Sequence, residues 1–171
     1  VRLVDAAGNP VQTGEVGEVV IRGPTLMLGY WDMPELSAEA MRDGWFHSGD
    51  LAYQDEKGYI FLTDRKKDMI ISGGFNVYPK EVEEVLYTHP AVFECAVIGV
   101  SDPDWGEAVR AIVALRPSTT ATEKELLDFC RGHLSNFKRP KSVGFLEEIP
   151  RNPSGKVLKR VLREEVLPRN H

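Results

Sequence analysis

Short apolar stretches separated by turn-forming residues dominate the first third of the chain. Apolar residues gather at 1–4, 17–21 and 59–62. Short runs bounded by Gly, Pro, Asn and Asp are typical of β-strands. Residues 33–41 instead predict a short surface helix with a proline near its start. This is too little apolar sequence for an independent core, so we expect residues 1–66 to be the β-rich, incomplete end of a larger domain.

From residue 67 onward, helical and strand patterns alternate. Short Val- and Ile-rich runs at 92–100 and 108–115, joined by a loop at 101–107, predict strands, and 143–146 predicts a last strand. Pro79 opens a predicted helix that ends at His89-Pro90. Thr122 and Glu125 form a capping box for another helix. A terminal amphipathic helix contains Val157, Leu158, Val161 and Leu162.

These patterns together predict an α+β fold. Residues 67–171 are expected to form a small domain with a short central sheet and helices packed on it. Residues 1–66 are expected to supply a mostly β remnant of the larger domain. Its exposed strand edges favour pairing between chains, so a homodimer is a possible assembly.

Composition bounds the class of protein. The chain has 171 residues, of which 42% are apolar and 27% charged, as in ordinary soluble globular proteins. No apolar run approaches the ~20 residues of a membrane-spanning helix. The first residues have neither an initiator Met nor a signal-peptide pattern, so we expect the chain to start inside a longer one. Cys95 and Cys130 lie in apolar patterns without metal-ligand spacing, which predicts buried, reduced thiols and a cytoplasmic setting.

Charge is unevenly distributed along the chain. The net charge is −5, yet the last 41 residues, 131–171, are basic. Their positive residues are scattered and have no series of stacking aromatic residues, so we expect no nucleic-acid partner. The phosphates of a small ligand fit this basic segment better.

Three polar positions are candidates for chemistry. Asp50 follows Ser48-Gly49, which predicts a turn whose carboxylate accepts hydrogen bonds from a vicinal diol such as a ribose, or alternatively a simple cap. Arg65 ends a predicted strand, where its guanidinium fits a ribose hydroxyl or a phosphate oxygen, or a surface pair with Asp64 or Asp68.

Lys156 stands in Asn-Pro-Ser-Gly-Lys just before the terminal helix. A lysine on a loop held by backbone breakers suits an anion, although the same residues also describe a solvated turn. His47 and His89 have no companion nucleophile or metal-ligand spacing, so structural or surface roles are expected for both.

Three segments, 44–50, 63–79 and 152–156, resemble in order and spacing the end of the adenylate-forming enzymes. That superfamily includes acyl- and aryl-CoA ligases, luciferases and peptide-synthetase adenylation domains. Essentially the whole chain resembles the carboxy-terminal part of an acyl-CoA synthetase, which is a ligase. It implies two half-reactions: ATP and a carboxylic acid give an acyl-adenylate and pyrophosphate, and the thiol of CoA then displaces AMP.

The resemblance also implies roles for individual residues. Asp50 and Arg65 match the nucleotide-binding positions that hold the ribose, and Lys67 matches the hinge about which the small domain rotates. Lys156 matches the lysine required for adenylation. The positions that match the CoA site are Ser72, Gly73, Gly74, Trp105, Phe137, Arg139 and Lys141. For the last four, the plain alternative is a surface Trp and a solvated basic turn.

The cofactors implied are ATP, CoA and Mg²⁺, with the Mg²⁺ ligands expected outside this chain and no metal site within it. The Ser/Thr/Gly-rich phosphate loop and the Tyr-Gly-x-Thr-Glu segment of the family are missing from these 171 residues. We therefore expect a fragment that is inactive alone. The acyl pocket belongs to the missing part, and the resemblance favours a fatty acid in a bacterial-type ligase. Two alternatives stay open: an adenylation domain serving a carrier protein, and a non-catalytic CoA- or nucleotide-binding module.

Overall fold

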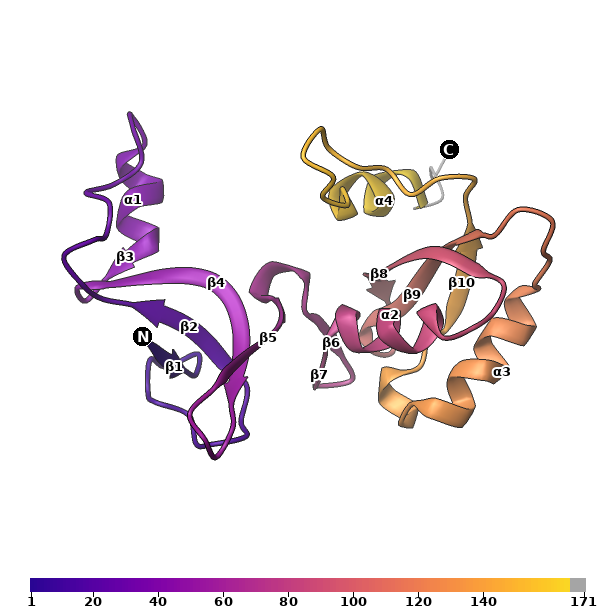
Figure 1. Ribbon diagram of the computed structural model, residues 1–171, viewed down its shortest axis with the longest axis horizontal. Coiled ribbons are helices and arrows are strands. Elements are labelled where there is room, and N and C mark those ends of the chain that lie inside the picture. The colour runs from indigo at the N-terminus through magenta and orange to yellow at the C-terminus, as the bar shows by residue number, and fades with distance from the viewer. Residues whose placement is uncertain (167–171) are drawn as a thin grey trace. The chain divides into compact units, whose positions relative to one another are not determined.

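A computed structural model of the chain describes residues 1–166. It contains two compact units, Val1–Lys67 and Asp68 onward, each built on its own five-stranded sheet (Figure 1). Helices flank the sheet of the second unit, so the α+β fold class is confirmed. The sequence placed the boundary one residue earlier, between residues 66 and 67.

The first sheet is entirely antiparallel. Its strands follow the order β1-β2-β4-β3, and β5 pairs with the far part of β4. The elements of this unit are β1 (Arg2–Val4), β2 (Gly17–Ile21), α1 (Pro34–Ala40), β3 (Met41–Arg42), β4 (Trp45–Gln54), β5 (Ile60–Arg65) and the 3₁₀ turn η1 (Lys66–Asp68). Its buried apolar cluster is small and centres on Leu3, Val19 and Ala52.

The second sheet is built around the long hairpin of β8 and β9. Strand β9 also pairs in parallel with β10, and its Gly106 pairs in antiparallel fashion with Ser72 of β6. Its strands are β6 (Ile70–Ser72), β7 (Phe75–Val77), β8 (Val92–Asp102), β9 (Gly106–Leu115) and β10 (Ser142–Phe145). The helices are α2 (Pro79–Tyr87), α3 (Glu123–His133), the 3₁₀ turn η2 (Asn136–Lys138) and α4 (Lys159–Val166).

Period-two alternation along β9 gives the second sheet two buried faces. Val109, Ala111 and Val113 pack against α2 and α3, whereas Ile112 and Ala114 face the opposite cluster, which includes Leu162 of α4. Burial of both faces explains why β8 and β9 read as nearly continuous apolar runs rather than alternating ones. The sheet is therefore a rigid platform from which the turns at its ends project.

Local signals explain where the helices begin. Pro79 occupies the first turn of α2, where its missing N–H leaves no hydrogen bond unmade. The predicted capping box at α3 is confirmed, because the Thr122 hydroxyl accepts from the Glu125 N–H and the Glu125 carboxylate accepts from the Thr122 N–H. The predicted terminal helix is present as α4 but begins at Lys159, so Val157 and Leu158, which were expected within it, lie before its first turn. Residues 167–171 lie outside the described part of the chain.

The structure differs from the sequence prediction in three further places, all of them strands. Residues 45–54 form the long strand β4, where a turn around Asp50 was expected. Residues 70–77 form the hairpin of β6 and β7, which the sequence did not indicate. The loop expected at 101–107 is shorter, because β8 continues to Asp102 and β9 starts at Gly106. In each place polar residues and glycines interrupt the apolar pattern that identifies a strand.

Both cysteines are buried and unpaired, as predicted. Cys95 lies on β8 and Cys130 on α3, and both belong to the core cluster between the sheet and the helices α2 and α3. Burial raises the pKa of Cys95 to about 12 and that of Cys130 to about 11. Among the described residues, no helix is long and apolar enough to cross a membrane.

We expect both thiols to be unreactive in the folded chain at pH 8, because the thiolate is the nucleophile and burial disfavours it. Titration with a thiol reagent at pH 8, with and without denaturant, measures this. Two thiols should react in denaturant and neither in buffer. Rapid labelling of either cysteine in the native protein would contradict the buried placement.

Candidate functional site

The candidate nucleotide site lies at a bulge in β4. Strand β2 pairs Glu18 with Leu51 and Val20 with His47, so residues 48–50 lie opposite the single residue Val19. A bulge of this kind bends a strand and turns side chains out of the regular alternation. Gly49 adopts a φ of 71°, a conformation that glycine takes without strain.

The bulge brings the two predicted ribose-binding residues together. Asp50 lies directly opposite Arg65 in the β4–β5 register. The Arg65 Nε donates to Asp50 Oδ1 at 2.8 Å, and the Asp50 side chain is about one-third exposed. Of the two residues considered as surface partners of Arg65, Asp64 accepts the Arg65 backbone N–H at its Oδ1 at 2.7 Å, and Asp68 pairs with Arg163. The pairing leaves the second oxygen of Asp50 for a hydroxyl of a ligand.

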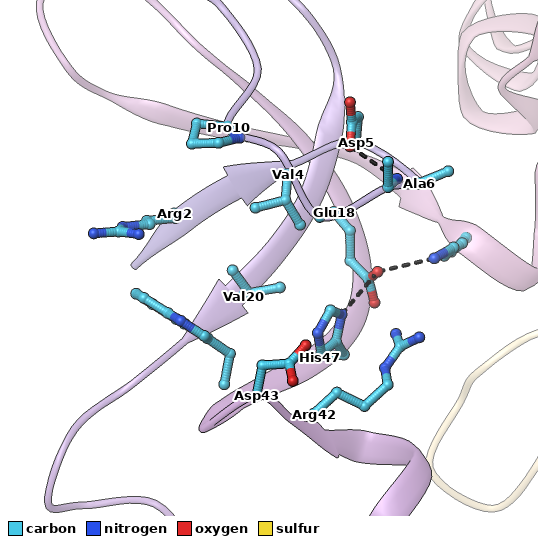
Figure 2. A pocket seen from close by; sticks show the side chains of 14 residues that line it. Arg2, Val4, Asp5, Ala6, Pro10, Glu18, Val20, Arg42, Asp43 and His47 are labelled. Carbon is cyan, nitrogen blue, oxygen red and sulfur yellow. Dashed lines mark hydrogen bonds and ion pairs between the residues drawn. The ribbon is translucent and has the colours of Figure 1, made fainter.

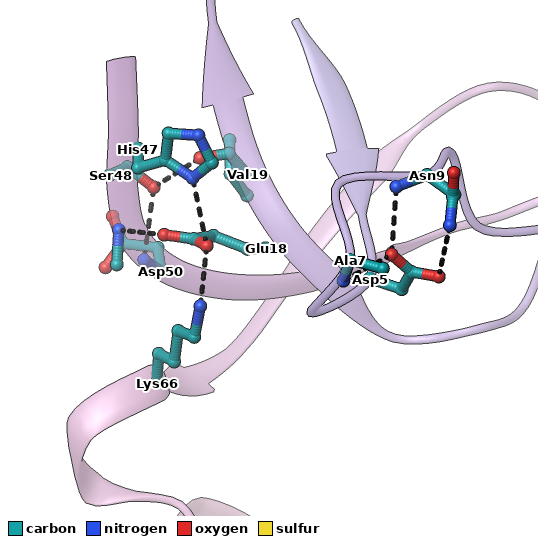
Figure 3. A network of polar contacts seen from close by, with 10 residues as sticks. Asp5, Ala7, Asn9, Glu18, Val19, His47, Ser48, Asp50 and Lys66 are labelled. Atoms are coloured by element: carbon teal, nitrogen blue, oxygen red, sulfur yellow. Dashed lines mark hydrogen bonds and ion pairs between the residues drawn. The ribbon is translucent and has the colours of Figure 1, made fainter. Parts of the chain in front are cut away.

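A buried carboxylate, Glu18 on β2, supports this bulge. Its side chain is only 6% exposed and accepts from His47 Nδ1 at 3.1 Å and from Lys66 Nζ at 2.9 Å (Figure 3). The N–H of Gly49 donates to its other oxygen at 3.3 Å. Burial raises the pKa of Glu18, but the hydrogen bonds from Lys66 and His47 outweigh it, so its pKa lies below the usual value.

Ser48 supplies a second tie between the bulge and β2. Its hydroxyl donates to the Val19 carbonyl at 2.8 Å and accepts from the Asp50 N–H at 3.1 Å (Figure 3). These side-chain bonds replace ladder bonds that the bulge interrupts. The backbone of Asp50 is therefore fixed from the neighbouring strand.

Two hollows of the first unit share the Glu18 cluster. One, of about 260 Å³, lies beside β1, and Figure 2 shows His47, Arg42 and Asp43 at its wall. The other, of about 620 Å³, is lined by the bulge and by the segment after β5, including Gly49, Arg65 and Lys67. The second hollow is the one beside the Asp50–Arg65 pair, which makes it the candidate space for a nucleotide.

Lys67, the predicted hinge, is exposed in the 3₁₀ turn η1 at the end of the first unit. Within the described residues, its ammonium has no hydrogen-bonding or ionic partner. Its neighbours on both sides are paired, Lys66 with Glu18 and Asp68 with Arg163.

Lys156 lies on a loop whose backbone is fixed by Asn152. The Asn152 Oδ1 accepts from the Ser154 N–H at 3.1 Å and from the Lys156 N–H at 2.8 Å. Gly155 provides the positive φ, 81°, that the turn needs. The Lys156 side chain is exposed and, among residues 1–166, has no partner, so a fixed backbone presents a free ammonium.

Arg151 fastens the Lys156 loop to the second sheet. One guanidinium nitrogen donates to the Gly155 carbonyl at 2.7 Å, and the other pairs with Glu94 of β8 at 3.0 Å. Because β8 belongs to the core of the unit, this contact transmits the sheet's rigidity to the loop. The sequence did not identify Arg151 or Glu94 as supports.

Most of the predicted CoA residues meet at one end of the second sheet. Ser72, Gly73 and Gly74 form the turn between β6 and β7, and the Gly73 N–H donates to the Trp105 carbonyl at 2.9 Å. The Trp105 ring lies so close to Gly73 that a Cβ there would be 2.4 Å from it. The Lys141 Nζ lies 5.0 Å from the centre of the same ring, a cation–π distance.

Phe137 and Arg139 have different surroundings. Phe137 stacks on Phe75, which follows the glycine turn, with ring centres 4.7 Å apart. Arg139 donates to the carbonyls of Leu134 and Arg131 at the end of α3, at 2.9 and 3.3 Å. Its guanidinium thus satisfies orphan carbonyls of that helix, and its proposed contact with CoA stays a prediction.

Sequence reasoning missed Glu18, the buried residue that supports the candidate nucleotide site. The available signal was a glutamate among the apolar residues of a predicted strand. Such a carboxylate is expected to be buried, and a buried carboxylate needs several hydrogen-bond donors around it. The structural role expected for His47 is confirmed by its bond to Glu18. His89 is also structural, accepting from the Ala91 N–H and packing edge-on against Phe129.

The described residues contain no group of three His, Cys, Asp or Glu side chains placed to hold a metal ion.

Comparison with known proteins identifies the family. Residues 81–156 match the family "AMP-binding enzyme C-terminal domain". A feruloyl-CoA synthase from Amycolatopsis sp is 52% identical over 163 residues, which are 95% of this chain and 33% of that protein. A long-chain-fatty-acid–CoA ligase from Salmonella typhimurium is 47% identical over 164 residues, 96% of this chain and 29% of that protein. The chain thus spans about a third of the length of the curated relatives it matches.

Solved structures give the same picture. ATP-bound MatB from Rhodopseudomonas palustris is 44% identical with a TM-score of 0.91, over 96% of this chain and 33% of that one. The o-succinylbenzoate CoA synthetase from Bacillus subtilis, solved with its acyl-adenylate intermediate, is 36% identical with a TM-score of 0.85, over 98% of this chain and 34% of that one.

The contact between Gly73 and Trp105 can be isolated with a matched pair of variants. Gly73 and Gly74 both have a positive φ, 57° and 81°, but a Cβ on Gly74 meets nothing within 4 Å. Gly74→Ala should cost about 1 kcal/mol from backbone strain alone. Gly73→Ala should cost at least ~1 kcal/mol more, because the Trp105 ring must move.

Chemical denaturation of the chain, followed by tryptophan fluorescence, measures both variants. A shift in the native emission is expected for Gly73→Ala and not for Gly74→Ala. Equal losses of stability with unchanged spectra would show that the Trp105 ring does not lie on Gly73.

Proposed function

Because the chain belongs to the adenylate-forming enzymes, among the AMP-forming acyl-CoA ligases, and contains their C-terminal domain, we propose that it works as part of a longer acyl-CoA synthetase. The overall reaction converts a carboxylic acid, ATP and CoA to acyl-CoA, AMP and pyrophosphate. The observation that carries this proposal is the Asp50–Arg65 pair, held in register at 2.8 Å in a chain so similar to named CoA ligases.

In this proposal the bulge of β4 holds the nucleotide. The free oxygen of Asp50 accepts hydrogen bonds from the ribose hydroxyls, while Arg65 holds the other oxygen and fixes the orientation of the carboxylate. The large hollow beside the pair, lined by Gly49, Arg65 and Lys67, has room for the ligand. Its position beside β4 supports this assignment.

Lys156 is proposed to act in the first half-reaction. Attack of the substrate carboxylate on the α-phosphate builds negative charge on the phosphoryl oxygens, which a compact ammonium stabilises. The exposed, unpartnered side chain on a loop fixed by Asn152 and Arg151 suits a group that must reach a ligand. Holding the backbone still lowers the entropy cost of placing the ammonium.

The second half-reaction is proposed to use the other end of the second sheet. The glycine turn at Gly73-Gly74 leaves space for a narrow chain such as pantetheine, and Trp105 with Lys141 suits an adenine ring and phosphates. The Lys156 loop and the glycine turn must each approach the same bound nucleotide, one in each half-reaction. The second unit is therefore proposed to rotate between the half-reactions, with Lys67 as the hinge.

The acid is proposed to be a fatty acid, supported by the fatty-acid ligases among the relatives at 45–47% identity. An aryl acid is the second candidate, supported by the feruloyl-CoA synthase at 52% identity. We propose that the acyl pocket lies in a part of the enzyme beyond this chain, so these residues do not choose between them.

The experiment assays a complete enzyme containing this sequence with ATP, Mg²⁺, CoA and a panel of fatty and aryl acids, following AMP and thioester separately. Lys156→Ala should lower acid-dependent pyrophosphate exchange by about 10²- to 10³-fold, because one donor to the transition-state charge is lost. Thioester formation from supplied acyl-adenylate should stay near the wild-type rate. Lys124→Ala, an exposed lysine of α3, is the matched control and should change neither rate.

The outcomes separate the alternatives. Thioester formation that depends on Lys156 supports the synthetase and identifies the acid. AMP release without thioester would point to a carrier protein as acceptor, and absence of all turnover would favour a binding module. Normal adenylation by Lys156→Ala would show that the lysine assignment is wrong.

A further inference from the structure

Two ion pairs lie on either side of Lys67, and each ties its neighbour to a different unit. Lys66 pairs with Glu18 of the first unit at 2.9 Å, and Asp68 pairs with Arg163 of the second unit at 3.2 Å. Lys67, between them, is exposed and has no partner among the described residues. The break between the two units falls directly after it.

The first pair is stronger than a typical surface contact. Exposed ion pairs contribute little, because water screens them and two flexible side chains must be ordered. The Glu18 carboxylate is 6% exposed and already fixed by His47 and Gly49, so only the lysine chain is ordered when the pair forms. Removing Lys66 would leave a buried charge short of one donor, which is costly.

The second pair also joins a mostly buried carboxylate to a more exposed cation. Asp68 is 14% exposed, and Arg163 follows Leu162, which is fully buried in the core against the second sheet. The helix α4 therefore holds the guanidinium in place, and Asp68 moves with that helix. The chain leaves the first unit at Lys66 and joins the second at Asp68.

We propose that Glu18 and Arg163 are positioning residues that confine the rotation of the second unit to the backbone of Lys67. This inference rests on the proposed function, in which that unit presents two different faces to one bound nucleotide. Without either pair the pivot spreads over residues 66–68, and orientations that serve neither half-reaction become populated. The competent fraction of the enzyme then falls, and the rates of both half-reactions fall with it.

The first test uses a complete enzyme containing this sequence and does not depend on activity. Glu18→Gln and Arg163→Gln each remove one pair while leaving the trypsin-sensitive sequence at residues 65–68 intact. The initial rate of cleavage within that segment, mapped by mass spectrometry, should rise about threefold to tenfold in either variant, because local opening exposes the bonds. Arg160→Gln breaks an exposed pair with Glu164 on the same helix and should leave the rate unchanged.

The second test uses the complete enzyme. Arg163→Gln should lower kcat about threefold to tenfold in both half-reactions and leave the KM for ATP within about twofold, because Arg163 lies in the other unit from the nucleotide site. The reversed pair, Asp68→Arg with Arg163→Asp, should recover most of the loss that either change causes alone.

The cleavage rates and the reversed pair each test whether Glu18 and Arg163 act as anchors. Cleavage rates equal to that of Arg160→Gln, or a reversed pair no better than the single changes, would overturn this inference. If Glu18→Gln does not fold, Lys66→Gln removes the same pair from its exposed side, and cleavage after Lys67 is counted instead. A wild-type enzyme without ligase activity would refute the proposed function, while the cleavage rates would still decide on the two anchors.

Discussion

The buried carboxylate of Glu18 is the constraint on which the first unit depends. A carboxylate removed from water must be surrounded by donors, and three come from two segments far from Glu18 in the chain: His47 and Gly49 of β4, and Lys66 after β5. Meeting that requirement fixes the bulge of β4 and brings the end of β5 beside it. Because the pKa of Glu18 lies below its usual value in the folded chain, this network stabilises the unit above the ordinary carboxyl pKa. The stabilisation is lost as the pH falls through the lowered value.

The second unit holds two candidate functional loops in fixed positions on one small sheet. Helices bury both faces of the β8–β9 hairpin, so the strands are fixed from two sides. The Lys156 loop is fastened to β8 through Arg151, and the glycine turn is fastened to the start of β9 through Trp105. Candidate functional groups thus stand on turns whose backbones are set by the sheet, an arrangement common in binding and catalytic sites.

The sequence predicted the elements that rest on local rules. The proline at the start of α2, the capping box of α3 and the runs that became β8 and β9 each follow from a signal within a few residues. It did not predict β4, because glycine and polar residues at the bulge hide the alternation that marks a strand. Nor did it predict the partners of Arg65, Arg139 and Arg163, since those contacts join residues that only tertiary structure brings together. The resemblance identified the motif residues, but the residues that hold them in place became visible only in the fold.

We propose above all that the bulge of β4 presents Asp50 to a ribose. The most direct measurement is the affinity of a complete enzyme containing this sequence for ATP, 2′-deoxy-ATP and 3′-deoxy-ATP, in the wild type and in Asp50→Asn. We expect the wild type to bind ATP more tightly than at least one deoxy analogue by about tenfold, the value of one charge-assisted hydrogen bond, and we expect Asp50→Asn to lose this preference. A preference of equal size in both proteins would contradict it, because the ribose would then be read by a residue other than Asp50.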